Sequence, residues 1–316
     1  MPELQCCSEK GLLVWRLKDY EKVNKLENGS TKFMTYREYT NKLINRFLLH
    51  GKKFVNYSCF QYGEISTIVS GEKSDAYVDD FQYFVFTKSI KTLVSIRALL
   101  NIGNVEDVLI LLRTTFEGYL ASRYIMEEYD KKLLEDFIFI PSQISMRKVI
   151  YENNVARDRR TNELIEYMQR NPSQMKLGKD KVYFYDLYAF LCNYAHCNYS
   201  VIPYYLDEGG MFTYEKKDNY SLVKILVLFV YTKLFENIVT VEGEDFYNLR
   251  EEKECYKLVK ESTEFLYDEL DALSKYNSEK ANDELNKHMR EMFKNMKKSL
   301  KEEIGSVKKD FLNDKK

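Results

Sequence analysis

GNVEDVLILLRTTFEGYLASRYI, residues 103–125, is the stretch that decides the fold of this chain. Its apolar residues recur every three or four positions, which predicts a helix with one buried face. Gly103 can adopt the left-handed conformation that ends a preceding helix, and Asn104 can accept hydrogen bonds from the first turn of the next one. Since residues 77–101 also read as a long apolar helix, the two helices should form an antiparallel hairpin.

The rest of the chain continues this helical pattern. Only 4 Pro and 12 Gly interrupt 316 residues, and the stretches between them are rich in Leu, Lys, Glu, Tyr and Phe. We therefore predict an all-α fold, a multi-helix bundle of long antiparallel helices. A small β hairpin is expected near residues 201–215, around the turn at 207–210. Further helices are predicted over residues 36–57, 131–140, 142–170, 179–199 and 219–240.

The domain organisation follows from changes in composition along the chain. Residues 1–35 form a loosely structured N-terminal lead-in, and residues 36–275 form the helical core. Residues 276–316 form a Lys/Glu-rich amphipathic helix, whose narrow apolar seam either docks on the body or pairs with a partner protein or a second copy through residues 285–312. The seam consists of Leu285, Met289, Met292, Met296, Leu300, Ile304, Val307 and Phe311.

Charge and cysteine content restrict the partners and the compartment. The 48 basic and 49 acidic residues nearly cancel, so any contact with RNA would need a local patch. The six cysteines form no CxxC series and the N-terminus carries no apolar leader, which indicates a cytoplasmic protein. Lys224 and Lys233 interrupt the most apolar run, at residues 219–240, which therefore reads as a core helix and not a membrane span.

Two charged residues on the predicted helix at 103–125 need partners. Arg113 and Glu117 share a stripe with Leu120 and Tyr124, bordered by apolar residues, and both charges should be largely buried. An unpaired buried charge is too costly to persist. A structural ion pair between Arg113 and Glu117, or bonds to tyrosine hydroxyls, would satisfy them. Alternatively, Arg113 holds a phosphate or carboxylate while Glu117 orients a histidine.

That histidine would be His196, at the end of the predicted helix that contains YDLYAFLCNYAHCN. A histidine beside Arg, Glu and Tyr can act as an acid or base, although a lone interior histidine is usually a satisfied core residue. The candidate catalytic residues are therefore His196, Arg113 and Glu117. The candidate binding residues are Tyr124, Tyr185, Tyr188 and Asn193.

Other chemistries have weaker support in the sequence. Cys192, His196 and Cys197 are poor metal ligands as a set, because Cys197 points about 100° away from His196 on a helix. No metal or cofactor is expected, since no P-loop, GxGxxG or nucleophile elbow occurs. The cations at residues 157, 159 and 160 could touch nucleic acid, although such runs are more often solvated faces.

These motifs resemble a bacterial family catalogued as domain of unknown function 5677. The matching positions are Gly103 in the turn, Arg113 and Glu117 in LLRTTFEGYL, and Tyr188 and His196 in the later Tyr-rich helix that ends LCNYAH. The likeness spans residues 77–240. It implies a cytoplasmic helical domain and supplies no established reaction.

A remoter resemblance is to HEPN ribonucleases, helical dimers that cut RNA with an Arg-x4-6-His motif and are common in toxin and anti-phage systems. This chain departs from that motif, since residues 189–191 before His196 are Ala, Phe and Leu. Arg46 and His50 are one residue too close together. If the protein is a nuclease of this kind, Arg113 would have to replace the missing arginine of the motif in space.

Two functions are consistent with these observations. In the first, the protein is a defence or toxin-like module whose Arg/Glu/His pocket binds or acts on a nucleotide or RNA. In the second, it is a non-catalytic interaction protein in which this cluster is structural and the C-terminal helix mediates association. Exposure distinguishes them, because an open pocket favours the first and a closed, satisfied network favours the second.

Overall fold

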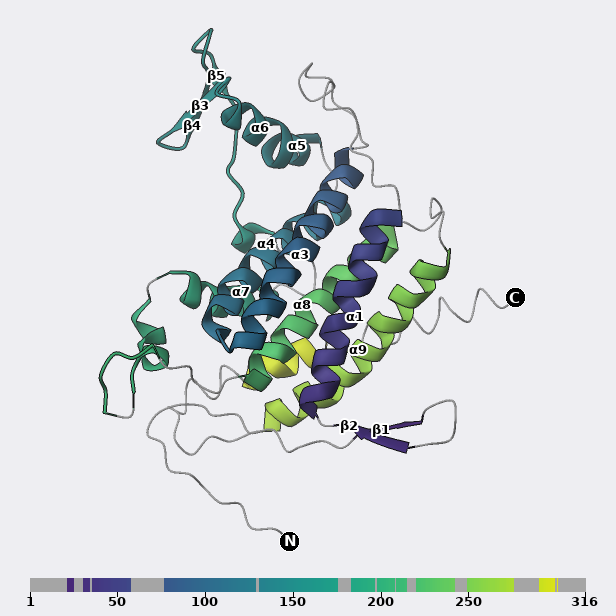
Figure 1. The fold of residues 1–316 in the computed structure, drawn as a ribbon. Helices are drawn as coiled ribbons and strands as arrows, with labels where there is room; N and C mark the ends of the chain where they lie inside the picture. Colours follow the sequence, from purple (N-terminus) through teal and green to yellow (C-terminus); the bar gives the residue numbers. More distant parts are fainter. Residues whose placement is uncertain are drawn as a thin grey trace.

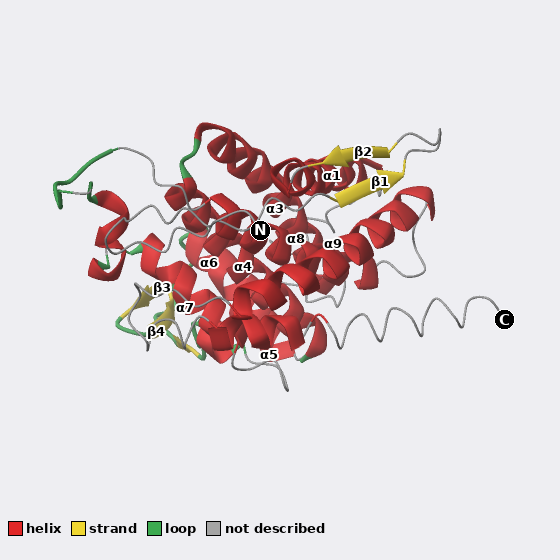
Figure 2. Ribbon diagram, turned by 90° about the horizontal axis from the view of Figure 1, so that it is seen from below, coloured by secondary structure: helices red, strands yellow, loops and turns green. Residues whose placement is uncertain are grey.

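The computed structural model shows a helical body with short strands at its periphery (Figures 1 and 2), which confirms the predicted all-α bundle. The long helices are α1 (Tyr36–Tyr57), α3 (Tyr77–Ile102), α4 (Val105–Glu127), α7 (Tyr183–Ala195), α8 (Tyr220–Val241) and α9 (Leu249–Lys275). The structure describes residues 22–25, 31–34, 36–57, 77–128, 131–175, 183–196, 198–207, 209–214, 220–241, 249–275, 290–298 and 300.

Helix α8 is the centre of the bundle, as its composition predicts. From residue 222 to residue 239 every side chain is buried except that of Glu236, and a helix that is apolar all round belongs in a core. Helices α3, α4 and α9 pack around it. Within the described part of the chain, no helix is long and apolar enough to cross a membrane.

The hairpin of α3 and α4 forms as predicted, with a different cap. Gly103 adopts a φ of 83°, the left-handed conformation that ends α3. Asn104 occupies the N-cap position of α4 but makes no side-chain cap bond, so that detail of the prediction is wrong. Instead, its amide nitrogen donates to the carboxylate of Asp107.

A hydrogen-bonded cluster of three buried polar residues holds α3, α4 and α8 together. The Nδ2 of Asn237 lies 3.0 Å from the Oε1 of Gln82 and 3.4 Å from the Oγ of Ser122. The Nε2 of Gln82 donates in turn to the backbone carbonyl of Ser122 at 2.8 Å. All three residues are buried, so the bonds hold only in one register of the three helices.

Helices α1 and α9 meet through two polar clusters. Glu261 on α9 accepts from the hydroxyl of Tyr39 at 2.8 Å and pairs with Arg46. One turn of α1 beyond Arg46, the Nδ1 of His50 lies 3.5 Å from a carboxylate oxygen of Glu251, and Lys53 lies 3.3 Å from the other oxygen.

Part of the predicted C-terminal seam docks on the body. Residues 290–298 are helical, and Met292, Met296 and Leu300 are fully buried in the main core together with Phe293. Lys297 pairs with Asp271 of α9 and lies over the ring of Tyr267 at 4.4 Å. The other seam residues lie outside the described residues, as does most of the N-terminal lead-in apart from the strands β1 (Lys22–Lys25) and β2 (Thr31–Met34).

The prediction of one helix over residues 142–170 is wrong. Helix α5 (Lys131–Leu134) continues directly into a π-helical stretch (Glu135–Phe139) and then into α6 (Ile140–Ser145). Pro141 lies in the first turn of α6 and does not interrupt this helical segment. The chain then forms an antiparallel sheet of β3 (Val149–Glu152), β4 (Val155–Asp158) and β5 (Leu164–Ile165). Asn153 and Asn154 have φ values of 51° and 62°, and two such residues make the tight turn that a hairpin needs.

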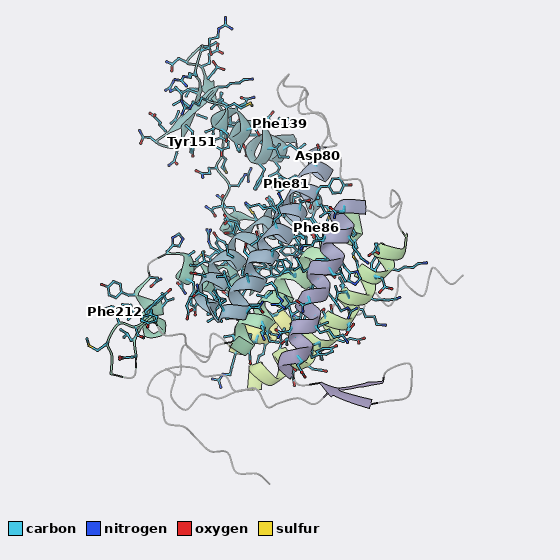
Figure 3. The ribbon with its side chains drawn as sticks, in the orientation of Figure 1. Asp80, Phe81, Phe86, Phe139, Tyr151 and Phe212 are labelled. Carbon is cyan, nitrogen blue, oxygen red and sulfur yellow. The ribbon has the colours of Figure 1, made fainter. Side chains whose placement is uncertain are left out.

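The α5 to β5 segment projects from one end of the α3–α4 hairpin (Figure 1). Its sheet packs on α6 through Ile140, Val149 and Ala156, a small cluster separate from the main core. In Figure 3, Tyr151 lies on this projection, and Phe212 lies on another projecting segment. Around Phe212 the hairpin expected near 201–215 is reduced to one bridge, between Leu206 and Phe212, after a 3-10 helix (Tyr199–Tyr205).

Candidate functional site

Arg113 meets its partners where α4 and α7 pack together. Its NH1 lies 3.0 Å from the Oε2 of Glu117, one turn along α4. On α7, its NH2 donates to the Tyr188 hydroxyl at 2.8 Å, and its Nε lies 3.4 Å from the sulfur of Cys192. The guanidinium carbon also lies 5.3 Å from the centre of the Tyr188 ring. All three guanidinium nitrogens therefore have a partner.

The two charges are less buried than the sequence predicted. The Arg113 side chain is 22% exposed and the Glu117 side chain 36% exposed, because both lie at the edge of the α4–α7 contact. The expected ion pair and tyrosine hydroxyl bond are both present. The ion pair uses the Oε2 of Glu117, and the residue also lines a cavity formed mainly by residues of α3 and α4.

The cluster keeps Arg113 charged and Tyr188 neutral. Burial opposes the charge of Arg113, but Cys192 and Glu117 outweigh it and raise the pKa of the guanidinium above its ordinary value. Burial raises the pKa of Tyr188 to about 12, and the neighbouring Cys192 and Glu117 add to this effect. Near neutral pH, Tyr188 is therefore a phenol and not a general base.

His196 does not lie on the inner stripe of α7 as predicted. The helix ends at Ala195, and His196 follows in a turn with its side chain exposed. Its backbone nitrogen donates to the carbonyl of Cys192 at 3.1 Å. The described chain after His196 enters a 3-10 helix at Tyr199–Tyr205, so the predicted helix over residues 179–199 is shorter than expected.

Of the four candidate binding residues, the structure places only Tyr188 beside Arg113. Tyr124 lies on α4 about 16 Å further along, at about 1.5 Å per residue, and packs on the main core. Tyr185 is exposed on the first turn of α7. Asn193 accepts a hydrogen bond from Asn198 at 3.0 Å, which ties the end of α7 to the segment after it.

The described residues contain no group of three His, Cys, Asp or Glu side chains placed to hold a metal ion. Cys192 is a free thiol that lies against Arg113. Cys197 lies outside the described residues.

A cavity on the other side of Glu117 was missed by the sequence analysis. It has a volume of about 370 Å³ and lies between α3 and α4, where Phe137, Arg170 and Met175 of the α5 to β5 segment and the chain after it close one end. This volume is near the lower end of the range of about 300–1,000 Å³ for small-molecule sites. Its polar lining residues include Lys88, Thr92, Thr114, Thr115, Glu117 and Arg170.

One wall of the cavity is aromatic. Phe81 lies between Phe84 and Phe137, with ring centres 6.5 Å away in each case. Figure 3 shows Phe81 near the end of α3 from which the α5 to β5 segment projects. Phe84 is 57% exposed. An exposed phenylalanine beside a cavity offers a flat apolar surface to a ligand.

The cations of the cavity differ in how far they are neutralised. The Nε of Arg170 lies 3.3 Å from the fully buried carboxylate of Asp136, which Lys132 also approaches at 3.6 Å. Lys132 pairs with Glu135 as well, so this group is neutral as a whole. In the described part of the chain Lys88 forms no ion pair with a carboxylate, and its Nζ lies 6.0 Å from the centre of the Phe84 ring. Of the two described cations that line the cavity, Lys88 is therefore the one without a carboxylate partner among the described residues.

The comparison with protein families confirms the resemblance that the motifs suggested. Residues 83–212 match the model of a family of unknown function (DUF5677). The matched region contains Lys88, Arg113, Glu117, Arg170 and Tyr188, and therefore the cluster and every lining residue of the cavity except Phe81. Comparisons with curated proteins and with solved structures gave no match.

Proposed function

We propose that this protein is a binding module for a phosphate-bearing small molecule of the nucleotide class, which enters the cavity between α3 and α4. The observation that carries the proposal is the cavity itself, which joins an unmatched cation, a second cation and an aromatic wall in one space of about 370 Å³.

The cations suit a phosphate group. Lys88 supplies a positive charge, and within the described residues Arg170 contacts Asp136 through its Nε, so the terminal nitrogens of its guanidinium can donate to a ligand. Guanidinium and ammonium groups that line one space are the usual partners of phosphate oxygens. The side chain of Arg170 is 23% exposed, so a ligand can reach it.

The aromatic wall suits a base. A nucleobase is flat, and its stacking on an aromatic ring is worth about 1–3 kcal/mol. Phe84 is the most exposed ring of the wall, and the alkyl stem of Lys88 lies one turn further along the same helix. A cavity of this size has room for one nucleotide and not for a folded polynucleotide.

The geometry favours binding over catalysis. Arg113 already has a partner at each nitrogen, Tyr188 is held as a phenol, and His196 is exposed after the end of α7. A nuclease in which Arg113 and His196 act together would need the two side chains to be close. No hydrogen bond or ion pair joins them among the described residues. The likeness to HEPN ribonucleases and the defence or toxin-like role stay predictions. Growth and RNA integrity after expression of wild type and His196→Ala in a bacterial host test them.

Calorimetric titration with nucleoside monophosphates tests the proposed binding. Wild type should bind at least one of them, and Lys88→Ala should weaken that binding about tenfold or more, because the variant removes the unmatched charge. Lys91→Ala is the matched control, since Lys91 is exposed on the same helix and does not line the cavity. Equal affinities of wild type and Lys88→Ala would contradict the site.

A further inference from the structure

We infer that Glu117 determines the specificity of this cavity by accepting two neighbouring donors of the ligand, so that the preferred ligand is a nucleoside monophosphate that offers such a pair. This inference rests on the proposed function and names its ligand class.

Glu117 lies between two environments. On one side its Oε2 pairs with the NH1 of Arg113 at 3.0 Å, and Arg113 is in turn held by Tyr188 and Cys192 on α7. On the other side the residue lines the cavity with Thr114 and Gly118. An ion pair of this kind limits the rotamers of the carboxylate, so the group that faces the cavity is held in place before a ligand arrives.

An ionised carboxylate can only accept hydrogen bonds, and its two oxygens have room for about four. Arg113 occupies one of these positions through NH1. The remaining positions suit a ligand edge with two adjacent donors. A ligand edge that presents an acceptor there would be repelled by the carboxylate, and its own acceptor would lose its hydrogen bond to water.

Nucleotides offer such a pair in two places. The guanine edge presents N1–H beside its exocyclic amino group, whereas adenine and cytosine present an acceptor beside their amino group. The 2′ and 3′ hydroxyls of a ribose form the other pair, and carboxylates in nucleotide sites commonly bind them. Both ligand groups share one chemistry, which is a pair of neighbouring hydrogen-bond donors on a molecule that also carries a phosphate.

The cations of the cavity suit the phosphate of the ligand. Lys88 and Arg170 line the same space from α3 and from the chain after β5, while Glu117 comes from α4. A phosphate near Glu117 would be repelled by its carboxylate, so the ligand should enter with its phosphate toward the cations and its donors toward Glu117. Charge therefore sets the orientation of the ligand.

The test compares GMP, AMP, dAMP and inorganic phosphate by calorimetric titration of the full chain. If the guanine edge is read, wild type should bind GMP about tenfold more tightly than AMP. If the ribose pair is read, AMP should bind about tenfold more tightly than dAMP. In either case Glu117→Gln should remove the preference among the nucleotides, because an amide replaces one acceptor oxygen with a donor. Inorganic phosphate offers no such donor pair and is repelled by the carboxylate, so it should bind the variant at least as tightly as wild type.

Glu127→Gln is the matched control. Glu127 lies on the same helix and forms the same kind of pair, with Arg123 at 2.8 Å, but it does not line the cavity. Equal binding of GMP, AMP and dAMP to wild type would overturn the inference and leave the proposed site standing, provided that the binding depends on Lys88. The absence of any nucleotide binding to wild type would overturn both.

Discussion

At the scale of single residues, Asn237 shows how one buried amide holds three helices in register. Asn237→Ala should lower the free energy of unfolding by about 2 kcal/mol, because it leaves the Oε1 of the buried Gln82 without its donor. Urea denaturation followed by circular dichroism measures the change. Lys91→Ala, exposed on α3, should leave the stability within about 0.5 kcal/mol of wild type. A loss that is equally small for Asn237→Ala would show that the network contributes little.

The same scale shows how much of the site the sequence could predict. The Arg113 and Glu117 pair and its contact with Tyr188 follow from the spacing on two helices, and the structure brings these residues together. His196 was misplaced because the helix ends one residue before it. Lys88 and Arg170 could not be found from sequence, since they line one cavity from segments about eighty residues apart and neither belongs to a motif.

At the scale of elements, the contact between α1 and α9 should respond to pH through His50. Burial lowers the pKa of His50 below its ordinary value of 6.5, although the nearby Glu251 opposes this effect. The unfolded chain therefore binds the proton more tightly than the folded one. The contribution of neutral His50 to stability is fully present above about pH 6.5 and is lost as the pH falls through the lowered pKa.

Chemical denaturation between about pH 5 and pH 7 measures this contribution. The free energy of unfolding of wild type should fall toward pH 5, and His50→Gln should reduce the slope by removing the titrating group. His196→Gln is the matched control, because His196 is exposed, and it should retain the slope of wild type. Equal slopes for wild type and His50→Gln would contradict the prediction.

The elements also show why one region was predicted wrongly. Residues 142–170 are polar and contain the arginines at 157, 159 and 160, so their charge pattern resembled a solvated helix. The sheet depends on Asn153 and Asn154, which tolerate the left-handed conformation, and on the packing of Ile140 against Val149 and Ala156. The second of these is a tertiary contact, which overrides local propensity.

At the scale of the whole molecule, the C-terminal helix contributes to the core. Truncation after Lys275 should lower the free energy of unfolding by at least about 4 kcal/mol, because it removes four buried side chains, those of Met292, Phe293, Met296 and Leu300. Thermal and urea denaturation measure the loss. Light scattering on the same samples tests association. A truncated chain that keeps its stability and loses only an oligomer would favour the interaction hypothesis instead.

The overall architecture was largely predictable, whereas the placement of its projecting segment was not. The α3–α4 hairpin follows from the apolar spacing and the left-handed Gly103. The buried position of α8 follows from its mostly apolar sequence, in which Lys224 and Lys233 are the charges before Glu236. The packing of the α5 to β5 segment on α3 depends on side-chain contacts such as that of Phe81 with Phe137. The residues that line the cavity come from α3, α4 and this segment with the chain after it, so the cavity exists only when these elements are packed together.

The most direct test of the account is a crystal structure of the full chain grown with GMP. The proposed site predicts density for one nucleotide between α3 and α4, with its phosphate at Lys88 and Arg170 and its donor pair at Glu117. Density for GMP at another place on the molecule, or an empty cavity at a concentration of GMP that saturates the protein in solution, would contradict it.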